Sequence, residues 1–225
     1  GWKNLTSITI PFVGSKAGVT SSDTYQYPFG YIFGSNSYDG GMATNQSYHG
    51  SSTSSTTNAT YYIPSTLKSV IVTGGNILYG AFYNCSSLTS IEIPNSVTSI
   101  GGSAFYNCSS LTSTEIPDSV TSIGKNAFYN CSNLISLVIG NGVTSIGGSA
   151  FYNCSSLTSI EIPDSVTSIG SYAFGGCSAL TITNLEISSN VTNIGEGAFN
   201  GWKNLTSITI PFVGSKAGVT SSDTY

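Results

Sequence analysis

Apolar and polar positions alternate in short segments that recur every 23 residues through most of the chain. The clearest copy is LTSIEIPNSVTSIGGSAFYNCSS, from Leu88 to Ser110. In its first part the Leu and Ile side chains are expected to point inward while Ser90 and Glu92 point outward, as in a half-buried strand. Pro94 has no backbone N–H to donate and ends this strand. Strands are predicted to begin at or near Leu67, Leu88, Leu111, Leu134, Leu157, Leu185 and Leu205.

The second half of the repeat predicts further contacts with the core. Val97 and Ile100 re-enter it from a second short extended segment, and Gly101 permits the next bend. Ala104–Cys108 is expected to close the repeat through a single helical or 3₁₀ turn. One phenylalanine per repeat is expected to join a continuous spine, made of Phe82, Phe105, Phe128, Phe151, Phe174 and Phe199.

Cysteine occurs at one fixed position of the repeat, at 85, 108, 131, 154 and 177. An odd number of cysteines at a constant spacing is not a disulfide framework, and metal sites need clustered spacings such as C-x-x-C. The next repeat has Trp202 in the same position. A position that accepts Cys or Trp is apolar, so buried structural thiols are predicted and no metal or cofactor.

The repeat divides the chain into four segments. Residues 1–11 are the end of a preceding repeat, and residues 67–211 are repeats of about 23 residues. Residues 12–66 break the pattern, are rich in Tyr, Gly, Ser and Thr, and are predicted to form a small β-rich island. Residues 212–225 begin a second copy of that island.

Two local features refine this division. Within the island, Tyr27–Phe33 and Thr60–Pro64 are predicted to be short strands, and the polar stretch Ser47–Asn58 between them a flexible loop. The spacing from Cys177 to Trp202 is 25 rather than 23 residues. The two additional residues predict a bulge at Ile182–Asn184.

A longer period is also present, because residues 1–25 are identical to residues 201–225. The chain therefore contains one 200-residue unit and the beginning of another, as expected of a piece of a tandem array. Each unit has seven strands, so at roughly 4.8 Å per stacked strand it would advance about 34 Å. The alternative is an overlap at the end of a shorter protein.

Composition excludes several classes of function. The net charge is −4 and none of the six basic residues is Arg, whereas nucleic-acid binding needs a cationic surface. No apolar run approaches the roughly 20 residues of a membrane span, and no signal peptide opens the chain, which begins within a repeat. His49 is the only histidine, and no G-x-S-x-G or phosphate-loop motif is present. No enzymatic activity is predicted.

The motif LxxIxIPxSVTSIGxxAFxxCxx, carried by Leu88–Ser110 and its copies, resembles the BspA-like (Treponema pallidum type) leucine-rich repeats of bacterial and some protist surface proteins. The resemblance covers about three-quarters of the chain. It implies a β-rich solenoid, a right-handed leucine-rich-repeat array with a parallel concave sheet, short turns on the convex side and a small β-rich insertion. It also implies an extracellular or cell-surface protein that adheres to host matrix or microbial surface proteins or glycans, without catalysis.

The outward strand position supplies the first candidate ligand-binding residues. Val138 interrupts the row and Thr209 ends it. Like charges on neighbouring strands repel, so a row of carboxylates could recruit a cation or a basic ligand; the alternative is a solvated row. The row is made of Glu92, Glu115, Glu161 and Glu186.

Aromatic residues supply the other candidates. One column follows the core phenylalanines and could stack on sugars or on another solenoid, or only on itself: Tyr83, Tyr106, Tyr129 and Tyr152. The island aromatics could bind a ligand, since insertions in solenoids often form the binding face, or form a local core that seals the edge of the array. They are Tyr25, Tyr27, Phe29, Tyr31, Phe33, Tyr61 and Tyr62.

Two classes of function follow from these features. The first is an adhesin, one unit of a tandem array that displays the concave face and the island to a protein or glycan. The second is a structural protein that self-associates into, or forms a segment of, an extracellular fibre or stalk. Both are compatible with each other, because an array of repeats displays many sites at once.

Overall fold

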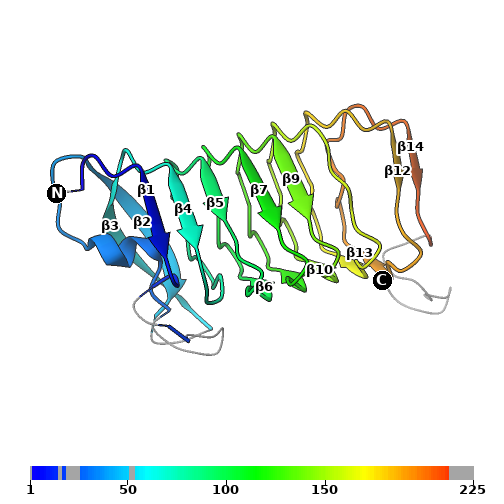
Figure 1. The fold of residues 1–225 in the computed structure, drawn as a ribbon. Helices are drawn as coiled ribbons and strands as arrows, with labels where there is room; N and C mark the ends of the chain where they lie inside the picture. Colours follow the sequence, from blue (N-terminus) through cyan, green and yellow to red (C-terminus); the bar gives the residue numbers. More distant parts are fainter. Residues whose placement is uncertain (1, 15–16, 19–25, 51–53, 213–225) are drawn as a thin grey trace.

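The computed structural model describes residues 2–14, 17–18, 26–50 and 54–212. Tyr25 and nearly all of the expected second island, residues 213–225, lie outside these ranges. The chain forms a right-handed parallel β-solenoid of the leucine-rich-repeat type, with coils stacked in one direction. Strand β1, Ser7–Ile10, and strand β14, Ser207–Thr209, lie at opposite ends of the array (Figure 1).

The first sheet is formed by the leucine-containing segments, as predicted. Its parallel order is β1-β4-β5-β7-β9, and β12 and β14 form a separate parallel pair. In β7 and β9 the inward residues are buried and the outward residues exposed, because successive side chains point to opposite faces. The remaining bounds are Ser69–Val72 for β4, Ser90–Glu92 for β5, Ser113–Ile116 for β7, Ser136–Ile139 for β9 and Asn184–Glu186 for β12.

The strand predicted at Leu157 is not formed. Burial still alternates there, but residues 157–163 have no strand assignment. After the bond from Thr158 N to Ile135 O, at 3.3 Å, the ladder opens. A cavity of about 480 Å³ is lined by both β9 and the segment around Ile160. The sheet is therefore divided between β9 and β12.

The second extended segment of each repeat forms a second parallel sheet, as predicted. Its strands pair in the order β13-β11-β10-β8-β6, with Ser opposite Ser and Ile opposite Ile from β6 to β11. The strands are β6 (Ser99–Ile100), β8 (Ser122–Ile123), β10 (Ser145–Ile146), β11 (Ser168–Ile169) and β13 (Asn193–Ile194).

The third side of each coil is a series of turns, so the helical or 3₁₀ turn predicted at Ala104–Cys108 is wrong. Ser103 and Asn107 have φ of 53° and 57°, in the left-handed region that no right-handed helix contains. Alternate amides also bond to the next coil, for example from Phe105 N to the carbonyl oxygen of Ala127 at 2.7 Å. The other amides bond to the residue three before them, as Cys108 N does to the carbonyl oxygen of Phe105 at 3.1 Å, so the segment is a series of β-turns and not a helix.

The predicted phenylalanine spine fills the centre of the solenoid. Successive rings from Phe82 to Phe174 are nearly parallel, with centroids 5.3, 4.7, 5.2 and 5.2 Å apart. Beside it, each of the four cysteines from Cys108 to Cys177 donates to a phenylalanine carbonyl of the preceding coil, as Cys177 Sγ does to Phe151 O at 3.3 Å. Trp202 Nε1 makes the corresponding bond to Phe174 O at 3.0 Å. This confirms that Trp202 occupies the cysteine position.

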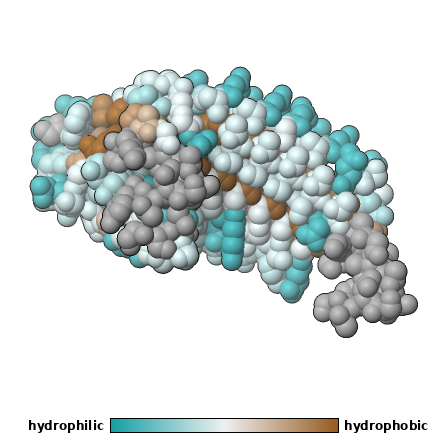
Figure 2. Space-filling model, turned by 90° about the horizontal axis from the view of Figure 1, so that it is seen from below, coloured by the Kyte–Doolittle hydropathy of each residue, from teal (hydrophilic) through white to brown (hydrophobic). Residues whose placement is uncertain are grey.

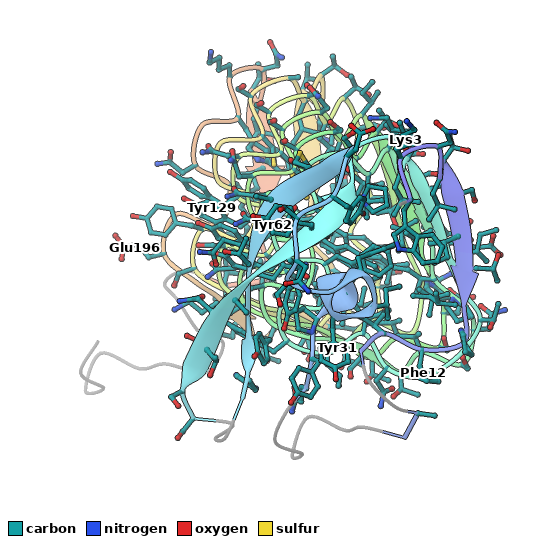
Figure 3. The ribbon with its side chains drawn as sticks, turned by 90° about the vertical axis from the view of Figure 1, so that its left-hand side faces the viewer. Lys3, Phe12, Tyr31, Tyr62, Tyr129 and Glu196 are labelled. Atoms are coloured by element: carbon teal, nitrogen blue, oxygen red, sulfur yellow. The ribbon has the colours of Figure 1, made fainter. Side chains whose placement is uncertain are left out.

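The island differs from its prediction in part. Phe29–Phe33 is the 3₁₀ helix η1 rather than a strand, preceded by Pro28 and ended by Gly34 at a φ of 83°. Strand β3, Thr56–Pro64, contains the predicted Thr60–Pro64 and pairs antiparallel with β2, Gly41–His49. The two ends of the predicted flexible loop, 47–49 and 56–58, are thus hairpin strand, and residues 51–53 lie outside the described ranges. Figures 1 and 3 show η1 and this hairpin lying across the β1 end of the solenoid.

The two additional residues before β12 show as two threonines, two positions apart, that each align with a different neighbouring coil. Thr181 Oγ1 donates to Thr158 O at 3.2 Å, in the preceding coil. Two residues later, the carbonyl oxygen of Thr183 accepts from Thr206 Oγ1 at 2.9 Å, in the following coil. The chain bends at Thr183, within the range predicted to bulge.

Candidate binding surfaces

The four glutamates do not form one continuous row. Glu92 pairs across the sheet with Ile71, and Glu115 pairs with Val138. Glu161 lies in the segment 157–163, which forms no strand, and Glu186 is in the separate β12–β14 pair. Glu92 and Glu115 are at the same position of neighbouring strands, so they form the only pair within the first sheet of the described structure.

A shallow groove of about 700 Å³ runs over this pair on the outer face of the sheet. Serines of β5, β7 and β9 form its floor, and the prolines that end β5 and β7 lie at one side. We call it the β5–β9 groove. Its outward-facing residues are Ser90, Glu92, Ser113, Glu115, Ser136 and Val138.

The sequence analysis did not single out the apolar end of the β5–β9 groove. Val138 and Ile135 are both exposed large hydrophobic residues on or beside β9. Ile135 occupies the position that Thr112 has in the preceding repeat, and Val138 the position of Glu115. Two outward positions of one repeat that change together to apolar residues were a visible signal, because exposed apolar patches often mark interaction sites.

The charge of the groove indicates the chemistry of its partner. Two carboxylates on adjacent strands repel each other unless a positive group lies between or above them. Among the described residues no group of three His, Cys, Asp or Glu side chains is placed to hold a metal ion. The β5–β9 groove therefore offers a basic group two carboxylates, with apolar side chains beside them.

The tyrosine column stacks on itself. Ring centroids from Tyr83 to Tyr152 are 4.7, 4.8 and 5.1 Å apart, and successive planes are within 16° of parallel. The ring faces are therefore covered by one another and are not available to a sugar. Tyr129 projects from the side of the array opposite β1 (Figure 3). Burial raises the pKa of Tyr83, and the neighbouring phenol of Tyr106 adds to the effect.

A second ladder lies directly beside the tyrosines. Asn130 Nδ2 donates to Asn107 Oδ1 at 2.9 Å, and Asn107 Nδ2 donates to Asn84 Oδ1 at 3.0 Å. The ladder ends on the island, where Asn84 Nδ2 donates to Asn45 O at 2.7 Å. These side chains use their amides on each other, which satisfies polar groups between coils.

The island aromatics divide into a buried and an exposed set. Phe29 is fully buried with its ring centroid 5.0 Å from that of Phe82, at an interplanar angle of 38°, and Tyr61 is also buried. These two residues belong to the core that seals the β1 end, and they are not exposed to a partner. Tyr31 is exposed, and Tyr27 stacks on it at 4.2 Å. With half-buried Tyr62, these residues remain candidates for contact.

The cysteine thiols are buried and are expected to be unreactive. All five are buried and unpaired. Burial raises the pKa of Cys108 and of Cys177 to about 12, and raises the pKa of Cys85, Cys131 and Cys154 well above the ordinary value. Since the thiolate is the reactive form, these side chains serve packing.

Comparison with known families follows this geometry. The family model for the BspA type Leucine rich repeat region matches residues 54–181 and 179–218, in six copies. The chain belongs to this family. The BspA-type assignment agrees with the repeat motif and with the stacked coils. A search of curated proteins gave no match.

Two solved structures are similar to this BspA-type chain. The T. pallidum Leucine Rich Repeat protein is 30% identical with a TM-score of 0.54, over 61% of this chain and 64% of its own. A leucine rich cell surface protein from Faecalibacterium prausnitzii is 40% identical with a TM-score of 0.56, over 64% of this chain and 39% of its own. The chain thus spans less than two thirds of either relative.

Family and neighbours support a leucine-rich-repeat protein, and one of these neighbours is described as a cell surface protein. Proteins of this repeat type are typically non-catalytic. Within the described ranges, no helix has the length and apolarity to cross a membrane.

Proposed function

We propose that this chain is one unit of an extracellular or cell-surface tandem array that binds protein or glycan partners without catalysis. The β5–β9 groove is the observation that carries the proposal. It joins the Glu92–Glu115 pair to the exposed side chain of Val138 on a regular sheet face, and the exposed Ile135 lies just before β9. A rigid, regular sheet loses little conformational entropy on binding, which favours affinity from a shallow surface.

The composition of the groove selects a class of partner. A protein surface with a Lys or Arg side chain next to an apolar side chain matches its carboxylates and its β9 end. Host matrix proteins and microbial surface proteins are the expected sources of such surfaces. A glycan is the other candidate partner, and it would use either the groove serines or, on the opposite side of the array, the phenol edges of the tyrosine column.

The test is adhesion of the purified chain to immobilised matrix proteins, microbial cells and a glycan array. Replacement of the pair by E92Q and E115Q is expected to weaken binding to protein about tenfold and to remove its salt dependence, because charge complementarity is lost. E186Q is the matched control, since Glu186 has the same repeat position outside the groove. Binding that survives E92Q, E115Q and V138T together would refute the groove as the binding face.

A fibre or stalk is the second candidate function. The identity of residues 1–25 and 201–225 favours it, because a solenoid that repeats without interruption extends along one axis. Electron microscopy of the native full-length protein tests this role. Rods or filaments with an axial repeat near 34 Å, from roughly 4.8 Å per strand, are expected. Short particles without axial order would exclude it.

A further inference from the structure

The structure contains the same sequence in two different surroundings. Residues 2–12 and 202–212 are identical, and both copies lie within the described ranges. The first copy is followed by the island and β4, while the second is preceded by the coil of Phe199. What covers each residue in one copy can therefore be compared with what covers its equivalent in the other.

The tryptophan is buried only in the second copy. Trp202 is 8% exposed, its Nε1 donates to Phe174 O at 3.0 Å, and its ring lies 5.2 Å from that of Phe199. Its equivalent, Trp2, is 51% exposed. The surroundings that bury this indole are thus the last coil of a unit.

The strand isoleucines show the opposite difference. Ile10 is 7% exposed in β1, where the strand pairs with β4 and the island follows. Its equivalent Ile210 is 40% exposed, and Ile208 is also exposed beside it. The surroundings that bury these side chains are the first part of a unit.

Strand pairing follows the same division. Ser207 is opposite Asn184 in the parallel pair β12–β14, and its equivalent Ser7 is opposite Ser69 in the parallel pair β1–β4. Both pairs run in the same direction, so one strand with this sequence can pair on one edge like β14 and on the other like β1. Figure 2 shows apolar surface gathered at the island end, where the first copy lies.

The aromatic core gives the same result. On one side, Trp202 continues the series from Phe174 to Phe199, whose rings are 6.2 Å apart. On the other side, the Trp2 ring lies 6.0 Å from that of Phe33, and Phe33 lies 5.4 Å from Phe29. The Phe29 ring in turn packs at a tilt against that of Phe82, 5.0 Å away. If the tryptophan that ends one unit is also the tryptophan that begins the next, the aromatic series continues through this ring from one unit into the following one.

From these comparisons we infer that the open β14 edge is covered by a second copy of this unit, which follows in the same polypeptide. Its island and its β4 cover the 202–212 segment as they cover residues 2–12 here. Trp202 is the joint of the spine, and the first sheet continues through β14 into the β4 of the following copy. The inference rests on the proposed tandem array.

Thiol labelling in two chains tests this joint. One is the full chain, and the other is the same chain with residues 26–225 added again after Tyr225. Ile210→Cys is expected to react quickly with iodoacetamide in the full chain. In the two-unit chain it is expected to react about tenfold or more slowly, because a buried thiol reacts only through local opening.

Ile10→Cys in the full chain is the reference for protection. The native thiols, five in the full chain and ten in the two-unit chain, are expected to stay unlabelled and so report that each variant is folded. Fast labelling of Ile210→Cys in both chains would overturn the inference. Protection in both chains would also overturn it, since residues 213–225 would then be the cover. If Ile210→Cys is protected only in the two-unit chain but native material shows no axial order by electron microscopy, the inference about the β14 edge stands and only the fibre role is excluded.

Discussion

Gln46 Nε2 donates to the carbonyl oxygen of Tyr83 at 2.9 Å, and this bond joins the hairpin of the island to the first complete coil. The same amide nitrogen lies 3.3 Å from Cys85 Sγ, and Oε1 accepts from Gly30 N at 2.6 Å. The Gln46 side chain is fully buried. One side chain thus holds η1, the hairpin and the solenoid together.

Replacement of Gln46 by Leu is therefore expected to destabilise the island end. It leaves the Gly30 N–H and the Tyr83 carbonyl without their partner, at about 1–3 kcal/mol for each buried polar group. Urea unfolding followed by circular dichroism measures the change. Asn45→Ala is the matched control, because only the backbone oxygen of Asn45 is used. Equal effects of the two substitutions would contradict the role of the amide.

The phenylalanine spine predicts a position-dependent cost. Phe128 is buried between two parallel rings, 4.7 Å from Phe105 and 5.2 Å from Phe151. Phe128→Ala is expected to cost about 3–5 kcal/mol, the range for a buried aromatic that leaves a cavity. Phe199→Ala is the control with the same chemistry, and it is expected to cost less because Phe199 is only half-buried in this chain. Similar thermal shifts for both variants would show that the rings do not act as a packed column.

The cysteine column predicts that the native protein has no reactive thiol. The pKa of every thiol is raised by burial, so at about pH 8 the thiolate fraction is very small and reagents cannot reach it. A colorimetric thiol assay is expected to find no free thiol in the folded chain and five after unfolding in guanidinium chloride. Rapid reaction of any thiol in the folded chain would contradict the packing described here.

The repeating core could be predicted from the sequence because each coil needs apolar side chains at the same inward positions. Residues such as Phe105 and Cys131 recur at one spacing, and only an inward position is apolar in every copy. Features that depend on a neighbour could not be predicted this way. Tyr27–Phe33 alternates like a strand, yet it forms η1, because Phe29 packs on Phe82 of a distant segment.

The candidate binding residues were predicted as positions but not as a surface. Glu92 and Glu115 were correctly placed on outward positions, while the separation of Glu161 and Glu186 from them depends on the opening after β9. That opening depends on pairing between coils, which no single repeat encodes. The apolar side chain of Val138 was visible in the sequence as an interruption of the glutamate row. Its exposure beside Glu115 in the structure makes it the apolar end of the β5–β9 groove.

His49 predicts how the stability of the island depends on pH. Its ring stacks 4.3 Å from that of Tyr79, at an interplanar angle of 8°, and its buried Nδ1 has no hydrogen-bond partner among the described residues. Burial lowers the pKa of His49 from its ordinary value of 6.5. A protonated ring carries hydrogen on both nitrogens, so protonation would leave a buried N–H unpaired.

The sign of the effect follows from proton binding. Because the pKa of His49 is lower in the folded state, the unfolded state binds more protons as the pH falls below 6.5. The contribution to stability is therefore complete above that pH and is lost progressively as the pH falls from it toward the lowered pKa. The thermal midpoint of the parent chain, relative to His49→Gln, is expected to decrease over this range. His49 is the only histidine, so the difference between the two chains isolates its titration. A difference that stays constant between about pH 8 and pH 5 would show that the ring titrates with its ordinary pKa.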